Sequence, residues 1–240
     1  MSSEIPLKNR RSQLERSDAM RVRLIEATIQ CLINEGYAGT TISKIIETAQ
    51  VSRGAPMHHF SSKAALIEAT AEHLMQGFYK ALSRMFTSID ASDDRLNDLI
   101  MSSWRNLLVT PQATAILELL VASRHEPELA AIMQKLWVLS YRYTRLTAKS
   151  YLEPISEEDS VGDLIVLTQW LLRGMAEDRH INAESADANI FFERYLKLWV
   201  QVLANHIRGR VNTKVDTNLE KANSLDSNFP KLDSTLFKKA

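Results

Sequence analysis

Cysteine, glycine and proline are scarce in this sequence, with one, seven and six residues among 240. The single cysteine, Cys31, excludes an internal disulfide and fits a reducing cytoplasm. It lies among apolar residues, where packing in the core is its expected role. The shortage of glycine and proline favours long helices that are joined by few turns.

Long apolar runs are also missing. No run approaches the ~18–20 residues that a membrane-spanning helix needs, so no membrane segment is expected. The basic N-terminus is not followed by an apolar segment, so it does not have the pattern of a secretory signal. We therefore expect a cytoplasmic protein without a membrane partner.

A surplus of charge is missing as well, since 29 basic residues balance 29 acidic ones. The net charge therefore gives no hint of a polyanionic partner. Residues 1–23 differ, because they carry six basic and three acidic side chains, a net charge of +3. Such a leader can supply phosphate contacts to DNA, although a solvated tail would explain the first ten residues equally well.

Motifs of catalysis and cofactor binding are absent too. The sequence has no P-loop, no glycine-rich dinucleotide fingerprint, no GxSxG elbow and no HExxH. No pair of cysteines could hold zinc, and the adjacent His58 and His59 would point about 100° apart on a helix, which hinders a shared metal. We expect no enzyme, no cofactor and no metal site.

The segment Thr41–Phe60 has the pattern of a helix-turn-helix. Thr41 can cap a first helix, because its hydroxyl can accept a free N–H of the first turn. Ser52 follows a short turn and is placed to cap a second helix over about residues 53–59, the recognition helix. At ~1.5 Å per residue this helix spans roughly 10 Å, which suits a major groove ~12 Å wide. The apolar face of the first helix comprises Ile42, Ile45, Ile46 and Ala49.

The outward side chains of this motif suit DNA. Arg53 can contact a guanine edge with two hydrogen bonds or hold a phosphate. Lys63 begins the next helix, where ammonium and helix N-terminus could meet one phosphate. Gly54 and Ala55 are small enough for the backbone to approach closely. Further expected contacts to phosphates or bases are Thr40, Thr41, Lys44, Ser52 and His58. A surface helical hairpin whose polar side is only solvated would have the same spacing.

The order of these residues resembles the DNA-binding domain of TetR-type transcriptional regulators. The resemblance covers residues 17–82, with Gly36-Tyr37, Thr40-Thr41-Ile42, Ala49 to Ala55 and His58 to Lys63 as its main matches. It implies a homodimeric, all-helical repressor whose DNA-binding domain is joined to a variable, ligand-sensing domain.

Two residues depart from the family pattern. Met57 stands where the family usually has a tyrosine that holds a phosphate, and methionine cannot donate a hydrogen bond. Met57 is still expected at the DNA surface, because it stands at the position of that tyrosine. Pro56 is also unusual, since proline is tolerated only in the first turn of a helix. It predicts that the recognition helix starts late or is tightly wound.

Helical periodicity continues through the chain, with no strand pattern and no repeat. A first helix is expected over about residues 17–35, with Gly36 just past its end. Ser62 is expected to cap a long fourth helix, which in the family connects the two domains. Later helices are expected at about residues 93–109, 111–124, 127–151, from the acidic segment after Pro154 to 178, and 186–208.

These elements predict an all-α fold. A three-helix domain with the helix-turn-helix is connected by the fourth helix to a C-terminal helical bundle for ligand sensing and dimerisation. The predicted divisions are a flexible basic N-terminus (1–16), a DNA-binding domain (17–78, motif 41–60), a ligand-binding and dimerisation domain (79–208) and a disordered tail (209–240).

Residues 161–175 and 190–203 are apolar almost all round, which requires burial on more than one side. A core face plus a dimer interface would satisfy this requirement. The resemblance places a four-helix homodimer contact in these last two main helices. A two-fold dimer would read a palindromic operator in double-stranded DNA, with half-sites about one helical turn, ~34 Å, or a multiple apart.

Large adaptable side chains in the second domain predict a pocket for a small, mostly hydrophobic effector. An arginine among them could meet a ligand carboxylate. Plain core packing, with Arg173 in an ion pair at the dimer interface, would explain the same residues. The pocket candidates are Met101, Trp104, Met133, Trp137, Tyr141, Trp170 and Arg173.

We therefore expect a sequence-specific DNA-binding transcriptional regulator, in the first instance a homodimeric repressor that a small ligand releases from its operator. Arg53 and His58 are expected to read base edges, and Thr41, Lys44 and Lys63 to hold the DNA backbone. A transcriptional activator would use the same residues. The alternative from another class is a helical protein-interaction module that has lost DNA binding, which the two departures from the family pattern favour.

Overall fold

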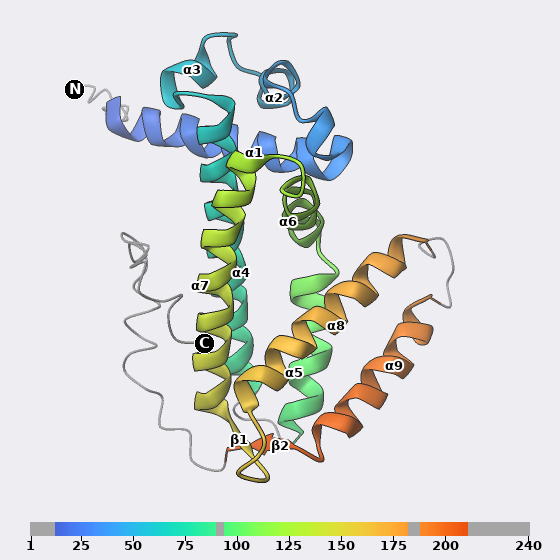
Figure 1. Cartoon of the computed structure of the whole chain (residues 1–240). Helices are drawn as coiled ribbons and strands as arrows, with labels where there is room; N and C mark the ends of the chain where they lie inside the picture. The colour runs from blue at the N-terminus through green and yellow to red at the C-terminus, as the bar shows by residue number, and fades with distance from the viewer. Residues whose placement is uncertain (1–12, 90–93, 182–187, 211–240) are drawn as a thin grey trace, which may run out of the picture. The chain divides into compact units, whose positions relative to one another are not determined.

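The computed structural model describes residues 13–89, 94–181 and 188–210, and these are helical almost throughout (Figure 1). This confirms the predicted all-α fold class. Most of the predicted flexible N-terminus and of the predicted tail lies outside the described residues, but residues 13–16 belong to α1 and Gly209 belongs to β2, so neither division begins or ends where it was predicted. The elements are α1 Gln13–Gly39, α2 Ile42–Ala49, α3 Ala55–His59, α4 Lys63–Ile89, α5 Arg95–Ser103, the π-helix η1 Trp104–Leu108, α6 Pro111–Ala122, α7 Pro127–Tyr151, β1 Leu152–Pro154, α8 Val161–Ile181, α9 Ala188–Leu203 and β2 Ile207–Gly209.

The chain forms two compact units. Unit 1 comprises the chain up to His73 together with Ala115–Ala130, and unit 2 comprises Leu74–Thr114 and the chain from Ala131 onward. Helices α4, α6 and α7 therefore each contribute residues to both units. The predicted division into functional domains at residues 78 and 79 stays a prediction.

Unit 1 is organised by the break in α1. Gly36 has φ +68°, a left-handed conformation that ends the straight part of the helix, as the sequence predicted. The next N–H, of Tyr37, donates to the Glu118 carboxylate of α6 at 3.1 Å. The apolar face of this helix is buried and consists of Leu24, Ile25, Thr28, Ile29 and Leu32.

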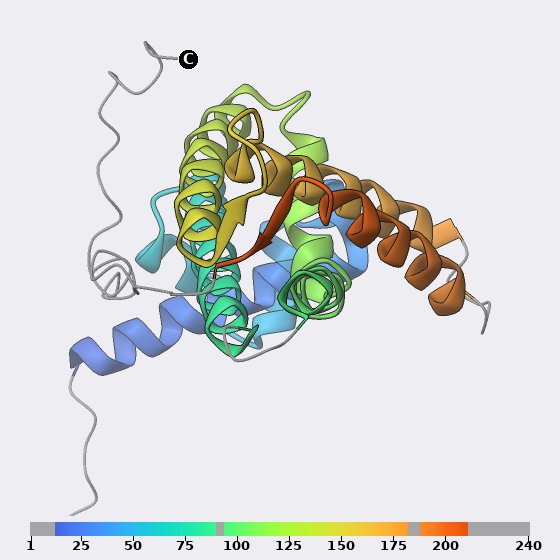
Figure 2. The same ribbon diagram turned by 90° about the horizontal axis from the view of Figure 1, so that it is seen from below.

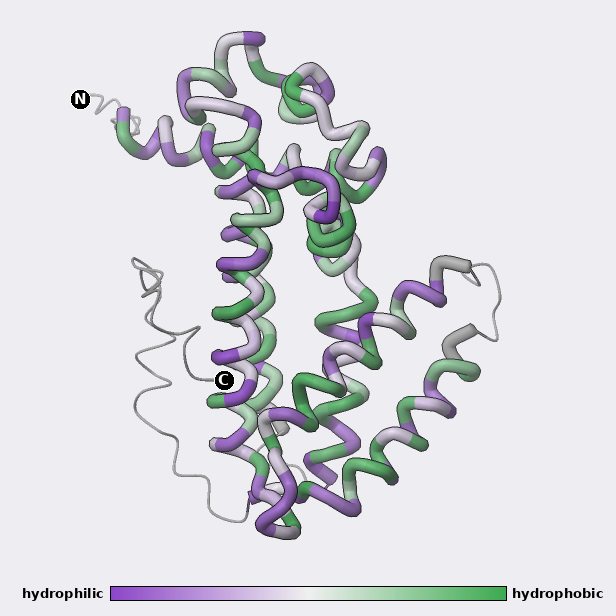
Figure 3. The backbone as a smooth tube through the Cα atoms, in the orientation of Figure 1, coloured by the Kyte–Doolittle hydropathy of each residue, from purple (hydrophilic) through white to green (hydrophobic). Residues whose placement is uncertain are grey.

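Unit 2 has its own core, in which Phe86, Leu172 and Leu196 are among the most buried side chains. Phe86 stacks on Tyr151 with ring centroids 5.1 Å apart, so α4 and α7 pack together through aromatic rings. Figure 3 shows hydrophobic residues recurring between hydrophilic ones along each helix, which is the periodicity that predicted them.

Three predictions about unit 2 differ from the structure. Strands β1 and β2 pair antiparallel, with Glu153 opposite Arg208, and run side by side in Figure 2. Three residues each are too few for an alternating pattern to be visible in the sequence. The last helix consequently ends at Leu203 rather than near residue 208. The helix expected over 93–109 is α5 followed by a π-helical turn, with Asp94 as its N-cap.

No helix in the described part of the chain is long and apolar enough to cross a membrane.

Candidate nucleic-acid interface

The first helix of the motif is capped as predicted. The Thr41 hydroxyl accepts the backbone N–H of Lys44 at 3.2 Å and begins α2. At the other end Gln50 adopts the left-handed conformation with φ 50°, and its N–H donates to carbonyls of α2. The guanidinium of Arg23 in α1 donates to the Gln50 carbonyl at 3.3 Å. The turn is therefore held from α1 as well as by its own backbone.

The recognition helix is shorter than predicted. It is α3, Ala55–His59, and its N-cap is Gly54 without a side-chain hydrogen bond. The prediction that Ser52 caps this helix is wrong, because Ser52 instead accepts the N–H of Ala55 through its backbone carbonyl at 3.0 Å. Pro56 is the second helical residue, where its missing N–H costs nothing, so the helix cannot begin much earlier.

The end of α3 is braced by a residue that the sequence alone did not single out. Arg21 of α1 donates to the His59 carbonyl at 2.5 Å, and its guanidinium lies 4.3 Å from the centroid of the Phe60 ring. Sequence reasoning placed Arg21 only in the basic leader. No local signal could have found this pairing, because the two residues are 38 positions apart.

Most of the predicted DNA contacts are exposed around α3. Ser52, Arg53, Gly54 and His58 are exposed, and the Met57 side chain is 57% exposed. A continuous polar surface with one large apolar side chain therefore surrounds the recognition helix.

Two of the residues predicted to contact DNA are buried instead of exposed. Thr40 is fully buried, and its hydroxyl donates to the Gly36 carbonyl at 2.7 Å. Ala55 is buried under the start of α3. Both residues support the motif from inside, so their side chains are not presented to a ligand at the surface.

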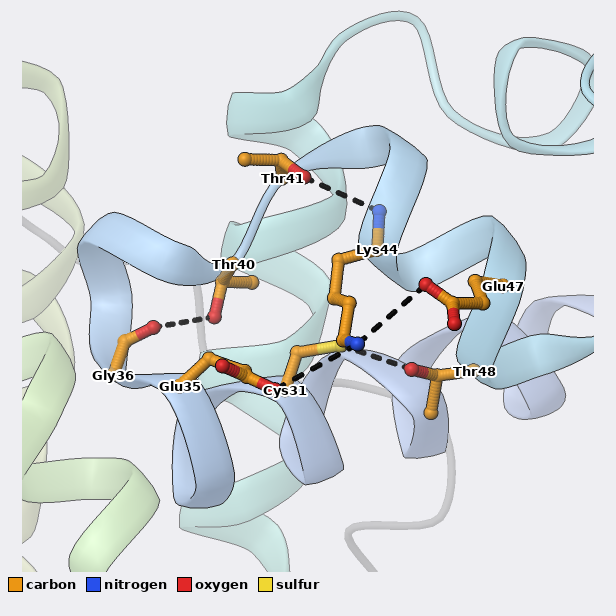
Figure 4. A network of polar contacts seen from close by, with 8 residues as sticks. All are labelled: Cys31, Glu35, Gly36, Thr40, Thr41, Lys44, Glu47 and Thr48. Atoms are coloured by element: carbon orange, nitrogen blue, oxygen red, sulfur yellow. Dashed lines mark hydrogen bonds and ion pairs between the residues drawn. The ribbon is translucent and has the colours of Figure 1, made fainter.

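Lys44 is held by two carboxylates (Figure 4). Its ammonium lies 3.7 Å from Glu35 of α1 and 3.5 Å from Glu47 of α2. The nearby charges of Glu47 first and Glu35 second raise the pKa of Lys44. Beside it, Cys31 is buried and its sulfur lies 3.4 Å from the Thr48 hydroxyl, which links α1 to α2. The predicted core role of Cys31 is confirmed.

Lys63 begins α4 beside an aromatic ring. Its ammonium lies 5.0 Å from the centroid of the Tyr37 ring, a cation–π contact. Burial first, and then the charges of Glu126 and Glu128, raise the pKa of Tyr37. Ser62 caps α4 as predicted, accepting the N–H of Ala65 at 3.1 Å. Lys63 is therefore positioned at a helix N-terminus, where an anion is also favoured.

The region that carries these residues matches a known family. Residues 24–70 match the family model described as bacterial regulatory proteins, tetR family. This part of the chain is similar to the TetR family. The resemblance read from the residues is confirmed by this match and by curated regulators of the same family.

Two curated relatives illustrate the likeness. The chain is 30% identical over 111 residues to the HTH-type transcriptional regulator BetI of Burkholderia thailandensis, covering 45% of this chain and 57% of the relative. It is 30% identical over 126 residues to CymR of Pseudomonas putida, covering 52% and 62%. The chain thus spans about three fifths of the length of these relatives.

Solved structures share the fold. A transcriptional regulator from Rhodococcus sp. Rha1 aligns with a TM-score of 0.62 at 19% identity, covering 78% of this chain and 97% of that one. A regulator from Saccharomonospora viridis in complex with choline aligns with a TM-score of 0.58 at 15% identity, covering 80% and 99%. These alignments show that the chain shares its helical fold with the two proteins.

The seven predicted pocket residues divide between the core and the surface of unit 2. Met101, Trp104 and Met133 are buried, and the Trp104 ring packs 5.4 Å from Phe192. The other four lie on α7 and α8, where Trp137 and Trp170 both donate to the Tyr141 hydroxyl. The Arg173 guanidinium lies 5.0 Å from the centroid of the Trp137 ring.

Two hollows occur in the described part of unit 2. One has a volume of about 20 Å³, room for a single water. It is lined by none of the seven predicted pocket residues. The other is a groove of about 360 Å³ between α8 and α9. The groove is lined by Leu171, Met175, Asp178, Phe191, Phe192, Tyr195, Leu198, Trp199 and Val202.

Proposed function

We propose that this protein is a sequence-specific DNA-binding transcriptional regulator. The observation that carries the proposal is the set of exposed residues 52–54, 57 and 58 at the short helix α3, where Arg21 of α1 braces the end of the helix and Arg23 braces the turn before it. A reading surface must be rigid, because base contacts depend on side-chain placement within a fraction of an ångström. The match of residues 24–70 to the family model and the names of the relatives support the same function.

The proposed contacts divide by role. Arg53 and His58 read base edges in the major groove, since both are exposed at α3. Thr41, Lys44 and Lys63 hold the DNA backbone. Lys44 must exchange its two carboxylate partners for a phosphate, so its net contribution is smaller than that of an unpaired lysine.

The proposed assembly is a homodimer through α8 and α9. These helices expose apolar side chains, among them Phe191 at 52% and Leu198 at 55%. The groove between them is itself lined mainly by apolar side chains, which a second copy of the two helices would cover. Two copies of α3 would then read the half-sites of a palindromic operator.

The proposed regulation is release by a small, mostly hydrophobic ligand, which makes the protein a repressor. Since the smaller of the two hollows holds only about 20 Å³, we place such a ligand elsewhere on unit 2 or in a different conformation of it. Differential affinity of a few kcal/mol for that conformation suffices for release. A regulator works where the DNA is, so we place the protein in the cytoplasm.

A second candidate function is a protein-interaction module. The exposed side chain of Met57, at the centre of the surface where a phosphate contact is usual, favours it. Methionine adapts to apolar partners and offers no hydrogen bond to a phosphate. An activator, by contrast, would share every contact with the repressor.

Selection from a pool of random duplex DNA tests the proposed function. The full chain is expected to enrich a palindrome whose half-sites are about one helical turn apart. Arg53→Ala should relax the consensus at one or two base pairs in each half-site. An unchanged pool after several rounds, from a chain with native helicity, would favour the protein-interaction module.

A further inference from the structure

Three aromatic side chains and an arginine form a cluster on α7 and α8, which we name the Trp–Tyr–Arg cluster: Trp137, Tyr141, Trp170 and Arg173. The indole N–H groups of Trp137 and Trp170 both donate to the Tyr141 hydroxyl oxygen, at 2.6 and 2.5 Å. The Tyr141 ring meets the two indoles edge to face, with centroids 6.2 and 5.9 Å apart. The cluster is therefore a defined arrangement rather than loose surface side chains.

The hydroxyl proton of Tyr141 is a donor that the two indoles do not use. A phenol oxygen has two acceptor positions and one proton. The two indoles fill both acceptor positions of Tyr141, so its own proton must be donated outward. Among the described residues no acceptor for this proton is present. Because Trp170 is 48% exposed and Tyr141 is only partly buried, a ligand can supply that acceptor from solvent.

A positive charge lies beside this donor. The Arg173 guanidinium lies over Trp137, whose N–H is bonded to Tyr141, so cation and phenol share one indole. In contrast, Arg145, also near α8, is paired with Asp163 at 2.8 Å. Arg173 forms no ion pair within the part of the chain that the structure describes. It is partly exposed, and its fork of donors fits a carboxylate.

We propose that the Trp–Tyr–Arg cluster binds a small monocarboxylate with a flat apolar body. The carboxylate accepts hydrogen bonds from Arg173 and from the Tyr141 hydroxyl, and the body packs on the exposed indole of Trp170. A cationic ligand is disfavoured, because Arg173 already occupies the cation position over the Trp137 ring and would repel a second cation. The role of this ligand as the effector rests on the proposed function. Its binding to the cluster does not depend on that function.

The position of Trp170 would allow a bound ligand to affect the proposed dimer. Leu167, Trp170 and Leu171 are three and four residues apart on α8 and are all exposed, so they share one side of the helix. That side belongs to the face we assign to the second copy. A ligand on Trp170 therefore sits at the rim of the proposed dimer contact, where it would bias the spacing of the two recognition helices.

Isothermal titration of the full chain with cinnamate tests this site. Saturable binding at one ligand per protomer is expected, with cinnamamide, its neutral isostere, and tetramethylammonium both binding much more weakly. Arg173→Gln should weaken cinnamate roughly 10- to 100-fold, the loss of charge-assisted hydrogen bonds. Arg173→Lys should recover part of the affinity, and Arg142→Gln, which removes an exposed charge next to Tyr141, should change little.

Four results would overturn the proposal. They are no cinnamate binding, equal binding of cinnamamide, tighter binding of tetramethylammonium, and cinnamate binding that Arg173→Gln leaves unchanged. The first would follow if an acidic side chain of the second copy fills the site in the dimer. Because the titration contains no DNA, its failure is separate from that of the proposed function, which selection with duplex DNA tests alone.

Discussion

The Arg21 guanidinium of α1 donates to the His59 carbonyl at the end of α3, and it also covers the Phe60 ring. One side chain thus satisfies a carbonyl at the last turn of the recognition helix and packs against the residue that ends it. A helix of five residues is too short to be stable alone. Its orientation therefore depends on such contacts from outside.

Arg21→Gln should consequently weaken specific DNA binding while the protein stays folded. The glutamine removes the charge-assisted hydrogen bond and the cation–π contact, which together contribute about 1–3 kcal/mol. Part of this loss should appear as a lower ratio of specific to unrelated DNA affinity. Fluorescence anisotropy with both kinds of DNA measures it. Arg16→Gln, an exposed position earlier on α1, is the matched control. Equal effects of the two variants would mean that Arg21 acts only through its charge.

Arg53→Ala and Lys63→Ala should weaken DNA binding in different ways. Arg53→Ala should cost about 1–3 kcal/mol at one or two base pairs and leave binding to unrelated DNA nearly unchanged. Lys63→Ala should weaken all sequences alike and reduce the slope of log affinity against log salt by about one. Titrations at several salt concentrations distinguish the two patterns. The same pattern from both variants would contradict the division of roles.

Glu47→Gln should strengthen DNA binding. The Glu47 carboxylate lies 3.5 Å from the Lys44 ammonium and competes with a phosphate for it. Removing its charge also removes a repulsion from the DNA backbone. The gain should be several-fold at low salt and should be smaller in Lys44→Ala, where only the direct repulsion remains, which makes a double-mutant cycle the measurement. Additive effects of the two substitutions would show that Glu47 does not act through Lys44.

Gly36→Ala should destabilise the protein by about 1–2 kcal/mol, the cost of a left-handed backbone for a residue with a side chain. A Cβ here would also lie 3.0 Å from a Glu118 carboxylate oxygen. Gly77→Ala, in α4 with open space around it, should instead stabilise by roughly 0.5–1 kcal/mol. Urea denaturation measures both. A neutral Gly36→Ala would mean that the break in α1 relaxes without the glycine.

Local features of this fold were predictable from the sequence. The caps at Thr41 and Ser62 and the helix end at Gly36 each depend on residues within four positions, so spacing alone identifies them. Pro56 also acted locally, since it set the late start of α3 that its ring chemistry predicts. The exposed contacts of segment 52–58 follow from that local geometry.

Contacts between distant residues were not predictable. The pairing of Glu118 with Tyr37 spans 81 positions. The pairing of β1 with β2 also joins residues far apart in the sequence, such as Leu152 and Gly209. The division of the pocket candidates between core and surface was not predictable for the same reason. Aromatic residues at helical spacing identify faces of helices, and only packing decides that Trp104 joins the core whereas Trp170 stays exposed.

The central claim is that the helix-turn-helix reads DNA as a dimer, and a DNA titration tests it most directly. Labelled DNA that flanks the coding region of this protein is titrated at two salt concentrations, with excess unrelated DNA as competitor. Saturable binding that survives the competitor, at two protomers per site, is the predicted result. Affinity equal to that for unrelated DNA, both here and in selection from random sequences, would contradict the claim and move the function to protein interaction.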